Sequence, residues 1–234
     1  MLTVLSYNIL FGNRIEEVIG WLVSSQKKYD ILCFQEFPRA KMPLVQKMLN
    51  PYVVSYASNV IYQGKDYGQL TVLQNKDSQL IEAVELQLGT NFFEDKVLRL
   101  RGQRSSLITK VRYGKKTILL ANTHLIAYAS NKLRRKQLSM VLEHIERISQ
   151  ETKPSPTILL GDFNYSSLLR RQKLFSLIKK YGYTNAHREN THRLLFVKHH
   201  QLDYIFYRNC NVSDVTLLKE SFSDHLPMAF HLHL

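Results

Sequence analysis

Polar side chains of the kinds that bind metals or move protons stand at the ends of six apolar segments of this sequence. They are Asn8, Glu36, His124, Asp162 with Asn164, Asp203, and Asp224 with His225. The clearest case is Thr157 to Asn164, where an Ile-Leu-Leu run typical of a buried strand ends in Gly161, followed by Asp162 and Asn164. Taken alone, this stretch fits an Asx-rich turn. Six such strand ends in one chain favour a shared site.

Four of these side chains are carboxylates, and their charges predict a cation if the strand ends meet at one edge. Two carboxylates ~5 Å apart at an effective dielectric of ~20 repel by roughly 3 kcal/mol, so such a cluster either protonates or recruits a cation. Hard oxygen ligands without a set of cysteines suit Mg²⁺ or Mn²⁺ better than structural zinc. A divalent ion there would stabilise charge on a phosphoryl oxygen and on a leaving oxygen.

The apolar patterns predict many short strands interrupted by a few helices. Strands are expected at 2–9, 29–34, 52–56, 70–73, 80–88, 105–113, 116–122, 158–160, 201–207, 212–217 and 228–232. Helices are expected at 15–23 after an Asn13-x-x-Glu16 capping box, at 42–49, at 131–149, and at 168–181 with Ser166 or Ser167 as the cap. This order predicts one domain over residues 1–234, an α/β sandwich with two packed sheets and helices outside.

Composition and charge limit the class of protein. The 234 residues are 44% apolar and 22% charged, and the absence of an apolar run of ~18 residues predicts no transmembrane segment. The first residues do not resemble a signal peptide, and Cys33 lies in an apolar run, so a cytoplasmic location is expected. The net charge of +13 indicates a polyanionic partner, with an anionic membrane surface as the rival and ordinary solubility as the simplest explanation.

Seven short motifs occur in an order that resembles the endonuclease/exonuclease/phosphatase superfamily. They are Ser6-Tyr7-Asn8-Ile9-Leu10, Gln35-Glu36, Tyr67-Gly68, Asn122-Thr123-His124-Leu125, Gly161-Asp162-Phe163-Asn164, Leu202-Asp203-Tyr204-Ile205-Phe206 and Ser223-Asp224-His225-Leu226-Pro227. The resemblance covers essentially the whole chain. It implies a four-layered α/β sandwich, in which two packed and mostly antiparallel sheets are flanked by helices, and metal-dependent hydrolysis of a phosphoester.

The resemblance also implies roles for the matched residues that would act on the substrate. Asp162 would activate the attacking water, and Asn164 would hold the scissile phosphate. His225, paired with Asp203, would contact the phosphate, and His124 would protonate the leaving oxygen.

The implied metal ligands are Glu36 as the main ligand, helped by Asp224 and Asn8. At one place the chain departs from the family pattern, since Gly68-Gln69 stands where many members have Gly-Asn. A substrate-facing amide is therefore either longer here or lost.

Several other residues have both a functional and a structural interpretation. Asp66 is a candidate to orient His124, and it is alternatively a solvated turn residue. His187 and His192 have no motif around them, and we interpret them as surface loop residues.

Basic residues suggest which phosphoester is the substrate. Residues 99–116 contain seven Lys or Arg and no acid, and residues 170–180 contain five and no acid. Arg104, together with Arg134 or Arg135, is a candidate for phosphate contact, and Tyr128 could stack on a base or sugar. The leading hypothesis is a metal-dependent nuclease, endonuclease or exonuclease, with little sequence specificity and no protein partner, acting as a monomer.

Two other functions remain open on the sequence. The first is a phosphatase or a phospholipase C-type enzyme acting on a phosphoinositide or a sphingomyelin-like substrate. The secreted sphingomyelinases would predict a signal peptide, a disulfide and an exposed apolar hairpin, and none is evident. The second is a non-catalytic nucleic-acid-binding relative, which is disfavoured because no expected catalytic position is replaced.

Overall fold

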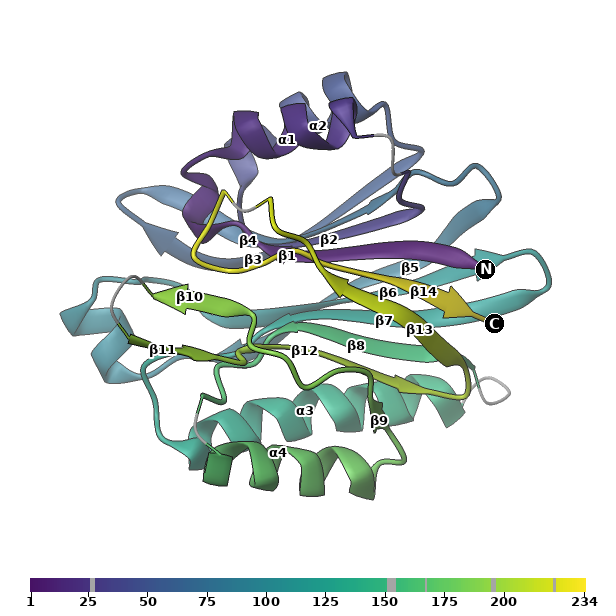
Figure 1. Cartoon of the computed structure of the whole chain (residues 1–234). Coiled ribbons are helices and arrows are strands. Elements are labelled where there is room, and N and C mark those ends of the chain that lie inside the picture. The colour runs from purple at the N-terminus through teal and green to yellow at the C-terminus, as the bar shows by residue number, and fades with distance from the viewer. Residues whose placement is uncertain (26–27, 151–154, 167, 195–196, 221) are drawn as a thin grey trace.

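The computed structural model of the chain places two six-stranded sheets face to face, with helices on their outer faces (Figure 1). It describes residues 1–25, 28–150, 155–166, 168–194, 197–220 and 222–234. The first sheet has the order β13 (Asn211–Leu217), β14 (Met228–His233), β1 (Leu2–Asn8), β2 (Ile31–Pro38), β4 (Lys65–Leu73), β3 (Val53–Tyr62). The second has the order β5 (Ser78–Gly89), β6 (Arg104–Tyr113), β7 (Lys116–His124), β8 (Thr157–Asp162), β12 (Asp203–Arg208), β9 (Thr184–Asn185).

The remaining elements are short connections and four α-helices. The helices are α1 (Ile15–Ser24), α2 (Met42–Leu49), α3 (Asn131–Gln150) and α4 (Leu168–Lys180). A two-stranded ribbon pairs β10 (His192–Leu194) with β11 (Val197–His200). Two 3₁₀ turns, η1 (Leu10–Gly12) and η2 (Arg39–Lys41), and a short π-helix, η3 (Phe93–Val97), complete the described part of the chain. None of the described helices is long and apolar enough to span a bilayer.

Three separate apolar cores hold the four layers together. One lies between α1, α2 and the first sheet, one between the two sheets, and one between the second sheet and α3 with α4 (Figure 1). Because successive side chains of a strand point to opposite faces, Ile158 and Leu160 of β8 enter the core between the sheets and Leu159 enters the core under the helices. Burial of both faces explains why β8 is a continuous apolar run.

Strand register brings the polar strand ends to one edge of the sandwich. Strands β1 and β2 are parallel with Asn8 opposite Gln35, and β7 and β8 are parallel with His124 opposite Asp162. Strand β12 runs antiparallel to β8 and places Asp203 opposite Asp162. The other described pairs within the two large sheets are antiparallel, so the predicted sandwich of mostly antiparallel sheets is confirmed.

Some local predictions were wrong. Helix α1 begins at Ile15 with Arg14 as its N-cap and no side-chain cap bond, so the predicted Asn13-Glu16 capping box does not form. The π-helix η3 and the short strands β9, β10 and β11 were not predicted. The alternative cap Ser167 lies outside the described residues.

Candidate active site

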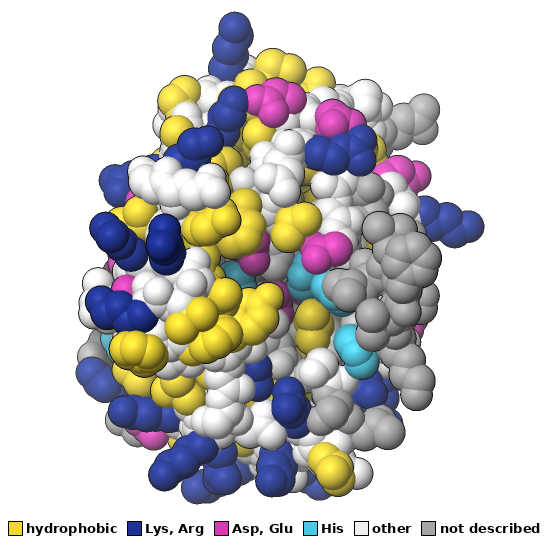
Figure 2. Space-filling model, turned by 90° about the vertical axis from the view of Figure 1, so that its left-hand side faces the viewer, with side chains coloured by type: hydrophobic (Ala, Val, Ile, Leu, Met, Phe, Trp, Pro, Cys, Tyr) yellow, Lys and Arg dark blue, Asp and Glu magenta, His cyan; other side chains and the backbone are white. Residues whose placement is uncertain are grey.

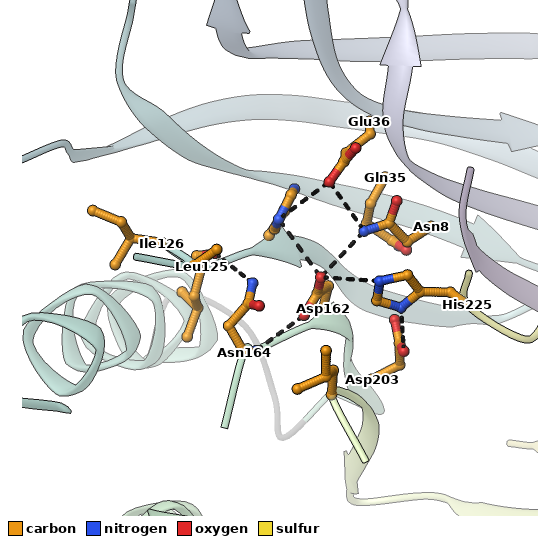
Figure 3. A network of polar contacts seen from close by, with 12 residues as sticks. Asn8, Gln35, Glu36, Leu125, Ile126, Asp162, Asn164, Asp203 and His225 are labelled. Carbon is orange, nitrogen blue, oxygen red and sulfur yellow. Dashed lines mark hydrogen bonds and ion pairs between the residues drawn. The ribbon is translucent and has the colours of Figure 1, made fainter. Parts of the chain in front are cut away.

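Asp162 lies at the centre of the polar strand ends (Figure 3). Its side chain is almost fully buried, and Asn8 Nδ2 donates to its Oδ2 at 3.1 Å and to Glu36 Oε1 at 3.3 Å. Two histidines face the same oxygen, with His124 Nε2 at 3.6 Å and His225 Nε2 at 3.8 Å. The Asn8 bonds link the edge of the first sheet to that of the second, so the site depends on the packing of both sheets.

Unusual backbone conformations aim these side chains into the site. Gly161 has φ +123°, and a Cβ atom there would lie 2.1 Å from the carbonyl oxygen of Thr123, so only glycine fits the close approach of β7 and β8. Glu36 adopts φ 57° at a register shift of the β2–β4 ladder, and Asn164 also has φ 57°. Such bulges redirect side chains at the cost of local strain, and they concentrate at functional sites.

A short buried hydrogen bond joins His225 to Asp203. The His225 Nδ1 to Asp203 Oδ2 distance is 2.7 Å, and both side chains are buried. Burial alone would lower the pKa of His225, but the charge and hydrogen bond of Asp203, with the charges of Asp162 and Asp224, raise it to about 10. His225 is therefore an imidazolium at neutral pH, with its Nε2–H directed towards Asp162.

The pKa of Asp162 moves in the direction expected of a general base. Burial, together with the charges of Asp203 and Glu36, raises the pKa of Asp162 to about 7, against the lowering effects of the His225 charge and of the hydrogen bond from the Asn164 N–H. A carboxylate with a pKa near the working pH takes up a proton from water more readily than an ordinary aspartate does.

His124 faces a buried ion pair that the sequence did not reveal. Arg104 Nε and Nη2 each donate to the Glu94 carboxylate at 2.9 Å, and Arg104 Nη1 lies 3.5 Å from His124 Nε2. Glu94 is fully buried and also accepts the backbone N–H groups of Ala127 and Tyr128. Burial, with the charges of Arg104 and His225, holds the pKa of His124 well below its ordinary value. His124 is therefore neutral at pH 7.

Glu36 has the features of a cation ligand. Burial raises its pKa, against the lowering effects of the His225 and Arg104 charges and of its hydrogen bonds from Asn8 and Phe11. In the described part of the chain, no Lys or Arg forms an ion pair with Glu36 or Asp162. Two neighbouring carboxylates, one buried and one partly buried, that have no Lys or Arg partner among the described residues fit a divalent ion, and oxygen donors fit Mg²⁺ or Mn²⁺. The family is generally dependent on divalent metals, and these acidic and histidine groups could bind one.

The other two predicted metal ligands are placed differently from Glu36. Asn8 Oδ1 accepts the N–H of Leu10 at 3.1 Å, so its amide turns Nδ2 towards the carboxylates. Asp224 Oδ2 lies 3.2 Å from His192 Nε2, and Asp224 Oδ1 lies 3.9 Å from His225 Nε2. Among the described residues, the clusters of potential ligands are His192 with Asp224 and His225, and Asp162 with Asp203 and His225. Asp224 is therefore grouped with His192 and His225 rather than with Glu36.

His192 is a second residue of this site, so the interpretation of His192 as a surface loop residue is wrong, as it is for the buried His187. The His192 ring packs edge-on against His225 with 4.8 Å between centroids, and its backbone forms an isolated bridge with that residue. The side chain is mostly buried. No motif surrounds it, so only the pairing of β10 with the segment before β14 shows that it belongs to the site.

The predicted phosphate ligand Asn164 already has partners on both of its donors. Its backbone N–H donates to Asp162 Oδ1 at 3.0 Å, and its Nδ2 donates to the carbonyl oxygen of Leu125 at 3.0 Å. Its side-chain oxygen stays directed away from Leu125 (Figure 3). These bonds fix the amide beside Asp162.

The four predicted substrate contacts fall into two groups. Arg104 and Arg134 are each 3% exposed, and Arg134 donates to the carbonyl oxygens of Ile126 and Ala127 as well as to Asn131 Oδ1. Tyr128 and Arg135 are exposed. Tyr128 and Arg135 are therefore open to a large substrate, whereas Arg104 and Arg134 are buried and support the residues around the site.

Two residues with open interpretations are structural. Gln69 is fully buried and exchanges hydrogen bonds with Ser105, so no amide at this position faces a substrate. Asp66 accepts hydrogen bonds from Tyr56 and Ser58, and its described contacts do not include His124. Neither residue belongs to the site.

Comparison with known proteins identifies the family. The chain matches the Endonuclease/Exonuclease/phosphatase family over residues 5–225, and it belongs to that family, whose members are phosphoesterase hydrolases. It is 24% identical to the UPF0294 protein of Erwinia tasmaniensis over 225 residues, which cover 94% of this chain and 81% of that protein.

Solved structures share the fold at low sequence identity. The mannosyl-6-phosphatase Bt3783 of Bacteroides thetaiotaomicron is 18% identical with a TM-score of 0.77, and the alignment covers 100% of both chains. The D. rerio TDP2 complexed with single strand DNA product is 16% identical with a TM-score of 0.76, covering 100% of this chain and 99% of that chain. The structural neighbours therefore include proteins that act on nucleic acids and phosphatases.

Proposed function

We propose that this protein is a divalent-metal-dependent phosphodiesterase that hydrolyses phosphodiester bonds of nucleic acids. The observation that carries the proposal is the environment of Asp162. One buried carboxylate oxygen, on Asp162, meets an amide donor and two histidines, and it lies beside the partly buried carboxylate of Glu36, which pairs with no Lys or Arg of the described residues. A water, a phosphate and a cation can all be held against this group of side chains.

In this proposal, Asp162 takes a proton from the water that attacks phosphorus. The bond from phosphorus to the leaving oxygen breaks as the new bond from water forms. The Nε2–H of His225, kept cationic by Asp203, donates to a non-bridging phosphate oxygen, and the second N–H of the Asn164 amide, whose first donates to Leu125, would hold the same phosphate. The Asp203 bond thus matters because it fixes which ring nitrogen faces the substrate.

His124 would supply the proton that the leaving oxygen takes up. Burial and the charges of Arg104 and His225 lower the pKa of His124 in the free protein, so the ring would donate as an imidazolium, whose proton on Nε2 is favoured by the negative charge of a phosphate bound beside that nitrogen. Its other nitrogen, Nδ1, is buried. Only Nε2 can therefore reach a substrate.

Glu36 would be the main ligand of the metal, with Asn8 and Asp224 near it. When bound, the ion supplies positive charge that stabilises the phosphoryl and leaving oxygens. Glu36 itself is held for this by the N–H of Phe11, which donates to its Oε2 at 2.9 Å. This bond leaves Oε1 directed at Asn8 and His124.

Charge supports nucleic acid as the substrate. The net charge of +13 and exposed basic residues such as Arg135 attract a polyanion, and a structural neighbour was solved with a single-stranded DNA product. Arg104 and Arg134 are too buried to serve as long-range phosphate contacts, so Arg135 carries this role. A cytoplasmic, monomeric protein remains our prediction.

A substrate panel tests the proposal. The protein is incubated with single-stranded DNA, duplex DNA, RNA, an abasic duplex, a phosphoinositide and sphingomyelin vesicles, each with Mg²⁺ or with EDTA. We expect cleavage of nucleic acid with Mg²⁺ only, lost in Asp162→Asn and kept in Asp77→Asn, an exposed aspartate at a distant turn. Turnover of the phosphoinositide or of sphingomyelin without nucleic-acid cleavage would support the phosphatase or phospholipase alternative instead. Binding of nucleic acid without turnover of any substrate would support the non-catalytic one.

A further inference from the structure

Three aromatic side chains stand exposed beside the candidate active site. Phe92, Phe93 and Tyr128 are 75%, 45% and 59% exposed, although large apolar side chains are usually buried. Figure 2 shows hydrophobic side chains gathered next to the opening in which acidic and histidine side chains are visible. The rings of Phe93 and Tyr128 lie against each other with 6.2 Å between centroids. We call these three residues the aromatic platform.

Hydrogen bonds hold the platform in place. Asn91 Nδ2 donates to the carbonyl oxygen of Tyr128 at 2.8 Å, and Asn91 Oδ1 accepts the N–H of Glu94 at 2.8 Å. The buried Glu94 carboxylate in turn accepts the N–H of Tyr128 at 3.2 Å. The two segments that carry the rings are thereby tied together, so the exposed rings are positioned without being buried.

The same carboxylate connects the platform to the catalytic residues. Glu94 binds Arg104, and the guanidinium of Arg104 reaches His124. A phosphodiester at His124 therefore has the platform within reach of its neighbouring nucleotides. The platform is placed to contact the part of the substrate that flanks the scissile bond.

Charges around the platform favour a polyanion. Lys96, Arg99, Arg101, Lys132 and Arg135 are exposed in the segments that carry or follow the rings. The acid beside the platform, Asp95, is neutralised by Lys96 at 2.8 Å. Exposed rings among cations suit a chain that alternates flat aromatic groups with phosphates.

We propose that Phe92, Phe93 and Tyr128 stack on unpaired bases next to the scissile phosphate, so that the substrate is single-stranded nucleic acid or an unpaired strand end. The inference rests on the proposed nuclease function. In a duplex the faces of the bases are covered by their neighbours and only their edges are open in the grooves, so a stacking platform requires unpaired bases. Stacking is indifferent to base identity, in agreement with the low sequence specificity expected for this enzyme.

Oligonucleotide binding tests the platform separately from catalysis. Fluorescence anisotropy in the Asp162→Asn background compares three labelled probes of equal length: oligo(dT), the same backbone with abasic sites, and a blunt duplex. Adding Phe92→Ala or Tyr128→Ala should weaken oligo(dT) binding by roughly 5- to 150-fold per ring, the range expected for loss of one stacked base. Binding of the abasic backbone should be unchanged by these substitutions. Tyr128→Phe, which keeps the ring, should bind oligo(dT) as tightly as the parent protein does.

The matched control is Tyr52→Ala. Tyr52 is 61% exposed and pairs its N–H with Leu73, at the end of β4 opposite the site, so its loss should leave all three probes unaffected. Equal losses on oligo(dT) and on the abasic backbone, or no loss at all, would overturn the platform. Sedimentation with phosphatidylglycerol vesicles tests whether the platform binds a membrane instead. If the Phe92 and Tyr128 variants abolish vesicle binding and leave oligonucleotide binding unchanged, the platform is a membrane contact and the proposal is overturned.

A substrate without flat rings separates failure of the platform from failure of the proposed function. The abasic backbone offers no ring to stack, so its Mg²⁺-dependent hydrolysis should be lost in Asp162→Asn and kept in Phe92→Ala. Hydrolysis without a platform effect on oligo(dT) would refute the platform alone. A platform effect without hydrolysis of any phosphodiester would refute the catalytic function on which the substrate assignment rests.

Discussion

Glu94 and Arg104 form a buried ion pair in which each charge compensates the other, so folding should be sensitive to the loss of either one. Their side chains are 0% and 4% exposed, and two hydrogen bonds of 2.9 Å join them. Removal of either partner leaves the other charge buried without compensation. We therefore predict that Glu94→Gln and Arg104→Met each lower the free energy of unfolding by about 3 to 5 kcal/mol.

The double variant distinguishes a compensating pair from two independent contacts. With both charges gone, neither remains buried alone, so Glu94→Gln/Arg104→Met should lower the free energy of unfolding by less than either single variant does. Glutamine keeps an oxygen that can accept the N–H groups of Ala127 and Tyr128, so those backbone bonds are preserved in the design. The cycle then reports the charge pair itself.

Urea unfolding at pH 7 measures this cycle, provided that the dependence on denaturant is unchanged between variants. The control is the exposed pair Arg14 and Glu17, whose side chains are 49% and 51% exposed. Its cycle should show no measurable coupling, because solvent screens surface pairs. Additive losses for Glu94 and Arg104 would refute the compensation that we infer from their burial.

Three further predictions concern pH, metal and backbone. Burial lowers the pKa of His187 from 6.5 to about 4, so the unfolded chain takes up the proton at a higher pH than the folded protein and the free energy of unfolding falls as pH drops from about 6.5 to 4. Wild type should therefore lose roughly 2 kcal/mol of stability between pH 8 and pH 5 that His187→Gln keeps. The same change in free energy of unfolding with pH for the two proteins, measured in urea, would contradict this. Glu36→Gln should remove most of the rise in melting temperature that Mg²⁺ gives to wild type, and an unchanged rise would show that Glu36 is not a ligand. Gly161→Ala should lower the free energy of unfolding by about 3 kcal/mol or more, because its Cβ would meet the Thr123 carbonyl oxygen. Gly114→Ala in the open β6–β7 turn should cost less, and thermal unfolding measures both. Equal costs would contradict the role of the close approach between β7 and β8.

The convergence of strand ends was predictable because it follows from local pattern. The apolar run of β8 ends at Gly161 and Asp162 whatever its partners are, and parallel pairing with β7 then sets His124 beside Asp162. The order of motifs supplied the rest of the sandwich. Periodicity and motif order are properties of short segments, and a single sequence displays them directly.

Residues of the site that depend on distant pairing were not predictable in this way. Glu94 lies in a short π-helix, and no motif or periodicity in the sequence marks it as the partner of Arg104. The ion pair with Glu94 also explains why Arg104 is buried, although the run of basic residues around it had indicated a phosphate contact. His192 reaches Asp224 only because β10 folds back over the site. Exposure of Phe92 was also unexpected, because apolar residues predict burial.

The most direct test of the central claim, that the residues around Asp162 form a phosphodiesterase site, is single-turnover cleavage of a labelled single-stranded oligonucleotide in H₂¹⁸O. Wild type with Mg²⁺ should cleave it and place one ¹⁸O atom on the product phosphate, while Asp162→Asn, folded by circular dichroism, should show no cleavage. Cleavage by Asp162→Asn at the wild-type rate, or product without ¹⁸O on phosphorus, would contradict the claim that Asp162 activates water for attack on the phosphodiester.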